Sequence, residues 1–221
     1  MLLYALLALF PVLSLAIPGT GCTSIGIITA RASTELPGEG VIGSLAQLIQ
    51  TRSRQTVSRA NVDYPALLFP YGTSSAAGTA ALKTQLTEAV RRCPDQGIVL
   101  LGYSQGAHVV GDVLGGGGGT GLGLKTPPVS TDVSKKVKAF VLMGDPRHRA
   151  EQSFNAGTAK RNGLFPREAD QSLEGFASSG VSYCDTGDTF CDSGIDTVTH
   201  LAYTAKYNDK ALQFVLDRIG G

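Results

Sequence analysis

The sequence predicts an α/β fold, a three-layer α/β/α sandwich in which helices cover both faces of a central, mostly parallel sheet. Three observations predict it. Short apolar runs alternate along the chain with longer segments of helical periodicity. Residues 97–101, Gly-Ile-Val-Leu-Leu, carry no polar side chain, which is typical of a parallel strand buried on both faces. The chain has 221 residues, 43% of them hydrophobic, which is enough to build one core.

The first half of the chain supplies four predicted elements. The apolar run within 24–28 predicts a strand, and the spacing of apolar residues by three or four predicts a helix over 41–54. A second apolar run predicts a strand at 65–69. A long helix follows over 74–92, with Ser74 or Ser75 as the expected N-cap.

The second half repeats the alternation. After the strand at 97–101, a helix is expected over 105–114, and the glycines that follow it predict a loop as far as residue 134. Apolar runs predict strands at 137–143 and, more briefly, at 181–183. A last helix is predicted over 209–219 from its apolar face. The crossovers between parallel strands are expected to be right-handed.

Charge excludes one class of partner. The chain has 19 basic and 18 acidic residues, a net charge of +1, and no long run of like charge. Nucleic-acid-binding proteins concentrate positive charge on one face, and this sequence has no excess to concentrate. We therefore expect no nucleic acid partner and a substrate without net charge.

The N-terminus is almost wholly apolar. Residues 1–17 form one apolar run, interrupted by Pro11 and followed by small residues, although no Lys or Arg precedes it. The run is shorter than the ~20 residues of a membrane span, so the alternative of a membrane anchor is disfavoured. We predict a signal peptide over 1–17, a single domain over 18–221, secretion to the extracellular space and no membrane attachment after cleavage.

Four cysteines follow the predicted signal: Cys22, Cys93, Cys184 and Cys191. An even number of cysteines in an exported protein predicts disulfides. Three pairings are possible, and because Cys184 and Cys191 bracket a short loop we expect them to pair, which leaves Cys22 with Cys93. A zinc site is the alternative. It is disfavoured, and no metal is expected, because no Cys-x-x-Cys or Cys-His spacing of ligand type occurs.

The strongest motif is Gly102-Tyr103-Ser104-Gln105-Gly106. It stands between a predicted strand and a predicted helix, which is the context that a G-x-S-x-G nucleophile elbow requires. The turn raises the serine hydroxyl above the sheet, and the N–H groups at the start of the helix face the oxyanion of an acyl-transfer reaction. Ser104 is therefore the predicted nucleophile.

A serine nucleophile requires a base, and the chain has three histidines. His108 lies one helical turn beyond Ser104 and cannot easily reach back, so it is interpreted as a packing or surface residue. His200 fits the order serine, acid, histidine of this fold and is the predicted base. His148 is the alternative.

The acid is expected to be Asp188, because the loop that Cys184 and Cys191 would close holds its carboxylate in place. Asp145, at the carboxyl end of a predicted strand, is the main alternative. The other acidic candidates are Asp185, Asp192 and Asp196.

Several segments together resemble one family. Residues 29–35 resemble an oxyanion loop, 72–77 the start of the helix before the elbow, 102–107 the nucleophile motif, and 184–191 with 200–203 the acid and base loops. The chain on these grounds resembles the cutinases and the fungal acetylxylan esterases, small secreted α/β hydrolases grouped as carbohydrate esterase family five. The resemblance covers essentially the whole chain after residue 17.

The resemblance implies particular roles. Ser104 would be the nucleophile, Asp188 the acid and His200 the base, and the backbone N–H groups of Ser33 and Gln105 would form the oxyanion hole. It also implies the pairs Cys22–Cys93 and Cys184–Cys191. The sequence departs from the family at Ala32, where cutinases usually have glycine, and slightly in the spacing from the acid to the base.

The implied function is a serine carboxylic ester hydrolase acting on short-acyl esters of plant cell-wall polymers, as a cutinase or an acetylxylan esterase. Cutin-like polyester, acetylated xylan and small soluble esters are the expected substrates, with no cofactor, no large lid and a monomeric protein. Apolar residues beside the site would favour a fatty acyl chain, although Leu67 and Leu68 could instead be strand core; the candidates are Leu67, Leu68, Val198 and Leu201. A non-catalytic secreted binding protein on a hydrolase fold is the alternative.

Overall fold

The structure is a computed structural model that describes residues 21–220, so the signal peptide predicted over 1–17 lies outside the described residues. Its main sheet has six strands, and every pair of neighbours in it is parallel. In spatial order the strands are β2 (Val57–Asn61), β1 (Ile25–Ala30), β3 (Gly97–Tyr103), β6 (Val137–Met143), β8 (Gly180–Cys184) and β7 (Asn155–Gly157).

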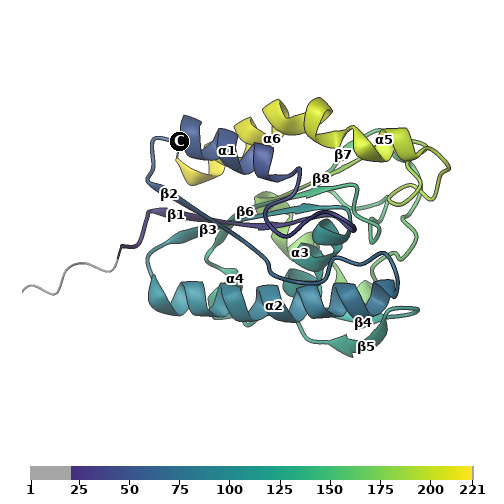
Figure 1. The fold of residues 1–221 in the computed structure, drawn as a ribbon, viewed down its shortest axis with the longest axis horizontal. Helices are drawn as coiled ribbons and strands as arrows, with labels where there is room; N and C mark the ends of the chain where they lie inside the picture. Colours follow the sequence, from purple (N-terminus) through teal and green to yellow (C-terminus); the bar gives the residue numbers. More distant parts are fainter. Residues whose placement is uncertain (1–20, 221) are drawn as a thin grey trace, which may run out of the picture.

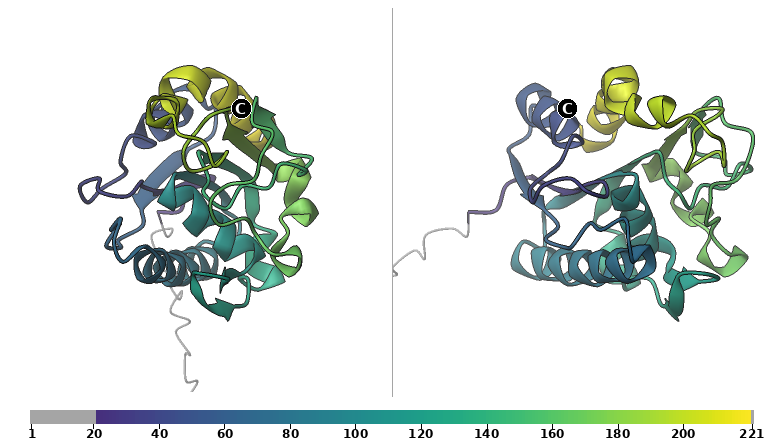
Figure 2. Two further views of the ribbon diagram at one scale, coloured as in Figure 1. Left: turned by 90° about the vertical axis from the view of Figure 1, so that its right-hand side faces the viewer. Right: turned by 45° about the vertical axis from the view of Figure 1, so that its right-hand side comes forward.

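Helices cover both faces of this sheet, as the sequence predicts (Figure 1). α1 (Gly43–Arg52) and α6 (Tyr203–Ile219) lie side by side on one face, while α2 (Tyr71–Arg92) and α3 (Gln105–Gly115) lie on the other. Figure 2 shows the same three layers from two further directions. The predicted α/β/α sandwich is therefore confirmed.

The core consists of two apolar layers, one on each face of the sheet. β1, β3 and β6 are buried almost throughout, and successive residues of a strand point to opposite faces. Adjacent residues in each of these strands therefore join different layers. The pairs are Ile27 and Ile28, Val99 and Leu100, and Val141 and Leu142.

The prediction of a strand at 65–69 is wrong. The strand in this part of the chain is β2, at Val57–Asn61, an edge strand whose residues are alternately half-buried and exposed. Most of its residues are polar. It has no apolar run to indicate it. The 65–69 segment instead leads into α2 with Leu67, Leu68 and Phe69 exposed, so the reading of these leucines as strand core is wrong as well.

The predicted loop before residue 134 contains small elements. β4 (Gly117–Gly119) and β5 (Gly123–Thr126) form an antiparallel hairpin, and α4 (Thr131–Ser134) follows them. The three-residue strand β7 was also not predicted. Both α2 and α6 begin earlier than expected, and Ser74 is buried inside the first turn of α2 rather than capping it.

Two disulfides fix the ends of elements. Cys22–Cys93 joins the start of β1 to the end of α2, and Cys184–Cys191 closes the loop that follows β8. α5 (Thr197–Leu201) lies between that loop and α6, and two 3-10 helices, Ala169–Gln171 and Glu174–Ser179, precede β8. Within residues 21–220, no helix has both the length and the apolar composition of a membrane span.

Candidate active site

The strand order places a crevice at the carboxyl ends of β1 and β3. The chain passes from β1 outward to β2, and then crosses to the other side of β1 to form β3. Connections that leave neighbouring strands in opposite directions open a crevice at that edge of a parallel sheet. The loop with Ser33 follows β1 and Ser104 follows β3, so the two segments meet there.

Ser104 occupies a sharp turn between β3 and α3. Its φ of 53° and ψ of −118° lie where residues other than glycine are strained. The flanking glycines are required by close backbone approach. A Cβ on Gly106 would lie 1.9 Å from the carbonyl oxygen of Ala30, and one on Gly102 would lie 2.5 Å from the carbonyl oxygen of Gly106.

The structure brings Ser104, His200 and Asp188 together. Ser104 Oγ lies 2.9 Å from His200 Nε2, and His200 Nδ1 lies 2.9 Å from Asp188 Oδ2. All three residues are buried, with Asp188 wholly inaccessible to solvent. The arrangement can deliver the serine proton to the imidazole while the carboxylate fixes the ring.

The imidazole of His200 is held by its surroundings. Asp196 accepts hydrogen bonds from backbone N–H groups of the first turn of α5 and so caps the helix that carries His200. The Tyr103 hydroxyl donates to the His200 carbonyl, and the Phe190 ring packs on the imidazole at 4.4 Å between centroids. Gly144 leaves the necessary space, since a Cβ there would lie 2.8 Å from His200 Cε1.

The environment of Asp188 favours its charged form. Burial acts to raise the pKa of its carboxyl, but the hydrogen bond and charge of His200 and two backbone N–H groups outweigh burial, and the pKa lies below its ordinary value. The two N–H groups are those of Phe190 and Cys191, which donate to Oδ1 at 2.7 and 2.9 Å. Asp188 is therefore a carboxylate at neutral pH.

The loop after β1 presents Ser33 to the same cavity as Ser104. Its shape is fixed by Glu35, whose carboxylate accepts from the Ala32 N–H at 2.6 Å, and by the Thr34 N–H, which donates to the Ala66 carbonyl at 2.7 Å. Ala32 therefore has its own N–H paired within the loop.

Gln105 lies at the first position of α3, where a backbone N–H has no partner within the helix. Its side chain is turned away and anchored. Gln105 Nε2 donates to the Leu67 carbonyl at 2.9 Å, and Oε1 accepts from Ser74 Oγ at 2.9 Å. The N–H of Gln105 follows Ser104 directly, which is the position of an oxyanion-hole donor in an elbow of this kind.

The cavity at Ser104 has a volume of about 320 Å³ and a mostly apolar lining. Leu68 and Leu201 line it, as expected for apolar residues beside the site, whereas Leu67 and Val198 are exposed outside it. Sequence reasoning missed further lining residues, most of them in connections without periodicity: Tyr71, Pro146, Leu164, Phe165 and Phe190.

The other acid and base candidates have different partners. His108 lies between the Tyr71 hydroxyl and Asp112, and His148 is buried with no hydrogen-bond partner on either ring nitrogen within residues 21–220. Asp145 forms an ion pair with Arg167. The remaining carboxylates are engaged elsewhere: Asp185 with Lys206 and Tyr207, Asp192 with Arg161 and backbone N–H groups, and Asp196 at the start of α5.

The structure also contains a buried ionic cluster that was not predicted. Asp112 Oδ1 accepts from Arg147 at 2.8 Å and Arg167 at 3.1 Å, and Arg167 also contacts Asp145 at 3.1 Å. Its members come from α3 and the segment after β6, so no local pattern indicates it. Among residues 21–220, no three His, Cys, Asp or Glu side chains converge to form a metal site.

The fold and the elbow serine define an α/β carboxylic ester hydrolase. Residues 21–219 match the family described as Cutinase, and the chain belongs to that family. It is 35% identical to Cutinase 11 of Verticillium dahliae, over 90% of this chain and 70% of that protein. It is 33% identical to Acetylxylan esterase 2 of Talaromyces purpureogenus, over 90% of this chain and 88% of that protein.

Solved structures agree with this assignment. The catalytic core domain of the acetyl xylan esterase from Trichoderma reesei superposes with a TM-score of 0.83 at 32% identity, over 89% of this chain and 99% of that chain. A cutinase-like protein from Cryptococcus sp. shares the fold, with a TM-score of 0.71 at 23% identity, over 90% of this chain and 96% of that chain.

Proposed function

We propose that this protein is a secreted serine esterase that cleaves short-acyl esters of plant cell-wall polymers through an acyl-enzyme intermediate. One observation carries the proposal. Ser104 Oγ, the two nitrogens of His200 and Asp188 Oδ2 form an unbroken chain with 2.9 Å at each link, and Ser104 opens onto an apolar cavity.

The first half of the reaction follows from this geometry. With the Nδ1 proton of His200 donated to Asp188, Nε2 accepts the hydroxyl proton of Ser104 as its oxygen attacks the ester carbonyl. The oxyanion accepts hydrogen bonds from the N–H groups of Ser33 and Gln105, with the Ser33 hydroxyl as a third donor. The C–O bond to the alcohol then breaks, and His200 returns the proton to the departing oxygen.

Water completes the reaction. His200 removes a proton from a water molecule, and the resulting attack on the acyl group forms a second oxyanion in the same hole. When this intermediate collapses, the bond from the acyl carbon to Ser104 breaks and His200 returns the proton to Ser104. The carboxylic acid leaves, and the enzyme regains its starting protonation.

Cavity size supports a short acyl group. About 320 Å³ is near the lower end of the range for small-molecule sites. Each buried methylene contributes ~0.8 kcal/mol until the cavity is filled, and further carbons extend into water without gain. We therefore propose a preference from acetyl to hexanoyl esters.

The rim of the cavity supports a polymeric substrate. Leu68, Leu164 and Leu201 line the cavity and remain 55%, 45% and 69% exposed. Exposed apolar groups beside a catalytic cavity favour contact with a large, sparingly hydrated substrate. Similarity to proteins named cutinase and acetylxylan esterase supports cutin-like polyester and acetylated xylan as the two candidates.

Secretion rests on the apolar run over 1–17 and on the two disulfides, which persist in oxidising compartments. Expression of the full chain in a secreting host tests it. We expect the protein in the medium, with an N-terminus near residue 18, as a monomer in size-exclusion chromatography. Retention of residues 1–17 in a membrane fraction would contradict the proposal.

The central test measures the acyl-enzyme. p-Nitrophenyl acetate should give a burst of nitrophenol equal to the enzyme concentration, and an organophosphate should label Ser104 and abolish turnover. Ser104→Ala should fold normally and lose about 10⁴-fold or more in kcat. A folded Ser104→Ala variant that retains turnover would disprove the assignment, and a wild-type protein without turnover would favour a non-catalytic binding protein.

A substrate panel then separates the polymers. Acetate release from acetylated xylan is compared with hydrolysis of cutin and of p-nitrophenyl esters from acetate to palmitate. Release from xylan together with a fall in rate beyond hexanoate indicates an acetylxylan esterase. Peak activity on palmitate would contradict the proposed acyl preference.

A further inference from the structure

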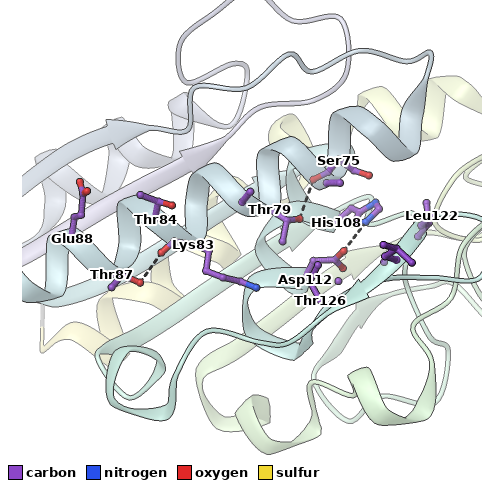
Figure 3. A pocket seen from close by; sticks show the side chains of 15 residues that line it. Ser75, Thr79, Lys83, Thr84, Thr87, Glu88, His108, Asp112, Leu122 and Thr126 are labelled. Carbon is purple, nitrogen blue, oxygen red and sulfur yellow. Dashed lines mark hydrogen bonds and ion pairs between the residues drawn. The ribbon is translucent and has the colours of Figure 1, made fainter.

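A second cavity, of about 520 Å³, is larger than the one at Ser104 and shares no lining residue with it. It lies between α2 and the β4–β5 hairpin, over the buried pair His108 and Asp112 (Figure 3). We call it the α2–hairpin groove. The reaction proposed above uses none of its residues.

One wall of the groove is a regular face of α2. Ser75, Thr79, Lys83 and Thr87 recur every four residues, and the residues that follow each of them also line the groove. The lining spans residues 75–88, which corresponds to about 20 Å along a helix. Figure 3 shows these side chains in a row along the helix, so the groove is elongated.

The floor of the groove is preformed. His108 and Asp112 come from α3 and are 1% and 2% exposed. The two ring nitrogens of His108 form hydrogen bonds with Tyr71 and Asp112. Asp112 in turn forms ion pairs with Arg147 and Arg167. A ligand therefore meets a rigid surface and loses little affinity to ordering the protein.

The opposite wall is the hairpin, and it is tied to the helix. Lys83 Nζ donates a hydrogen bond to the Pro127 carbonyl, just beyond β5. The hairpin contributes glycine backbone, the apolar side chains Leu122 and Leu124, and Thr126. Ala76 and Ala80 on α2 are small and leave the space between the walls open.

The hydroxyl groups of the groove are free to accept hydrogen bonds. The Ser75 hydroxyl donates to the Gly72 carbonyl, Thr79 to the Ser75 carbonyl, and Thr87 to the Lys83 carbonyl. Because each hydroxyl proton is committed to the backbone, the three oxygens keep lone pairs as acceptors; Thr87 is exposed, whereas Ser75 and Thr79 are only 2% and 4% exposed. Acceptors placed in a row suit a ligand that carries several hydroxyl donors.

The charge of the groove favours a neutral ligand. Lys83 and Glu88 are oppositely charged, and the carboxylate of Asp112 is balanced by two arginines. The ammonium of Lys83 keeps donors for ligand oxygens after its bond to Pro127. Besides the neutralised Asp112, the groove carries one positive and one negative side chain, so its summed charge favours neither an anion nor a cation.

We infer that the α2–hairpin groove binds a short segment of neutral oligosaccharide. An extended chain of hydroxyl-bearing rings matches the length of the groove, its row of acceptors, its balanced charge and the small apolar areas at Ala76, Ala80, Leu122 and Leu124. The inference does not depend on ester hydrolysis, because the groove is separate from Ser104.

Calorimetric titration with xylotetraose, which carries no ester, tests the inference. We expect saturable binding to the wild-type protein and to Ser104→Ala. Ala80→Phe fills the groove and should weaken binding about tenfold or more, the factor that a loss of 1.4 kcal/mol represents. Ala77→Phe is the matched control, because Ala77 is exposed on α2 but does not line the groove, and it should leave binding unchanged.

A second variant tests the hydroxyl oxygens of the groove without adding a bulky side chain. Thr84 and Thr87 both line the groove and are exposed. Replacing both by valine removes their hydroxyl oxygens at nearly constant volume and should also weaken binding. Hydrolysis of p-nitrophenyl acetate should stay at the wild-type rate in all α2 variants. Absence of saturable binding, or equal affinity in Ala80→Phe and Ala77→Phe, would overturn the inference. Protection of Ser104 from an organophosphate by xylotetraose would overturn it too, by placing the sugar in the catalytic cavity. Displacement of xylotetraose by hexanoate in Ser104→Ala would overturn it in favour of an apolar carboxylate.

Discussion

Asp188 Oδ2 lies 2.9 Å from His200 Nδ1, although the two residues belong to different segments, a disulfide-closed loop and a short helix. The other carboxylate oxygen, Asp188 Oδ1, accepts hydrogen bonds from two backbone N–H groups of its own loop. The carboxylate therefore has one orientation available, and that orientation sets the tautomer and the angle of the imidazole.

Asp188→Asn should lower kcat on p-nitrophenyl acetate by about 10⁴-fold with the fold intact, because an amide can donate to Nδ1 and stabilise the wrong tautomer. Stopped-flow measurement of the burst is the assay, since acylation itself should slow. Asp196→Asn is the control. Asparagine caps a helix as well as aspartate does, so α5 and His200 should keep their positions and kcat should change little. Full activity of Asp188→Asn would transfer the role of the acid to another residue.

The two disulfides should have separable effects. Cys22–Cys93 closes a loop with a sequence separation of 71 and should contribute about 4 kcal/mol through the entropy of the unfolded chain. Replacing this pair by serines should lower Tm with little change in kcat at temperatures where the protein stays folded.

Cys184–Cys191, with a separation of 7, closes the loop that holds Asp188. Its replacement by serines should lower kcat at temperatures well below Tm, because the carboxylate loses its fixed orientation. Thermal denaturation and kcat measured on the same samples distinguish the two pairs. Parallel loss of activity and stability in both variants would contradict this division.

The meeting of Ser104, His200 and Asp188 could be predicted because its signals are local. The elbow needs two glycines where Cβ atoms would meet backbone, and this requirement appears directly in the sequence around Ser104. The segment 184–191 likewise contains both Asp188 and the disulfide that closes its loop. The central strands were predicted for a related reason, since burial on both faces demands an uninterrupted apolar run.

The missed features depend on contacts between distant segments. β2 is polar and half-exposed, and only its pairing with β1 makes it a strand. Arg147 and Arg167 resemble surface residues in the sequence, yet both are nearly inaccessible because Asp112 and Asp145 neutralise them. No periodicity records such a pairing across the fold.

Asp112→Asn should destabilise the protein by about 3–5 kcal/mol, because it leaves two buried guanidinium groups without their shared carboxylate. Urea denaturation followed by circular dichroism measures the loss. Asp132→Asn, at an exposed ion pair with Lys135, is the control and should leave the urea midpoint unchanged. Equal midpoints for Asp112→Asn and the wild-type protein would show that the cluster contributes nothing to stability.

His148 should make the stability of the protein depend on pH in mildly acidic solution. It is 2% exposed, and neither ring nitrogen has a hydrogen-bond partner within residues 21–220. Burial lowers the pKa of this imidazole below its ordinary value, and the opposing influence of nearby carboxylates, Asp145 the largest, is weaker. The folded protein therefore keeps His148 neutral in a pH range where the unfolded chain would protonate it.

The sign of the effect follows from the direction of that shift. At pH values between the pKa of His148 in the unfolded chain, about 6.5, and its lower pKa in the folded protein, the unfolded state binds one proton more. The free energy of unfolding therefore falls as pH falls, by at most about 1.4 kcal/mol per pH unit. Above about pH 6.5 His148 is neutral in both states, and it no longer makes the free energy of unfolding depend on pH. Urea titrations from pH 5 to 8 should therefore show a smaller slope below about pH 6.5 in His148→Gln than in the wild-type protein. Identical slopes in the two proteins would mean that His148 does not contribute.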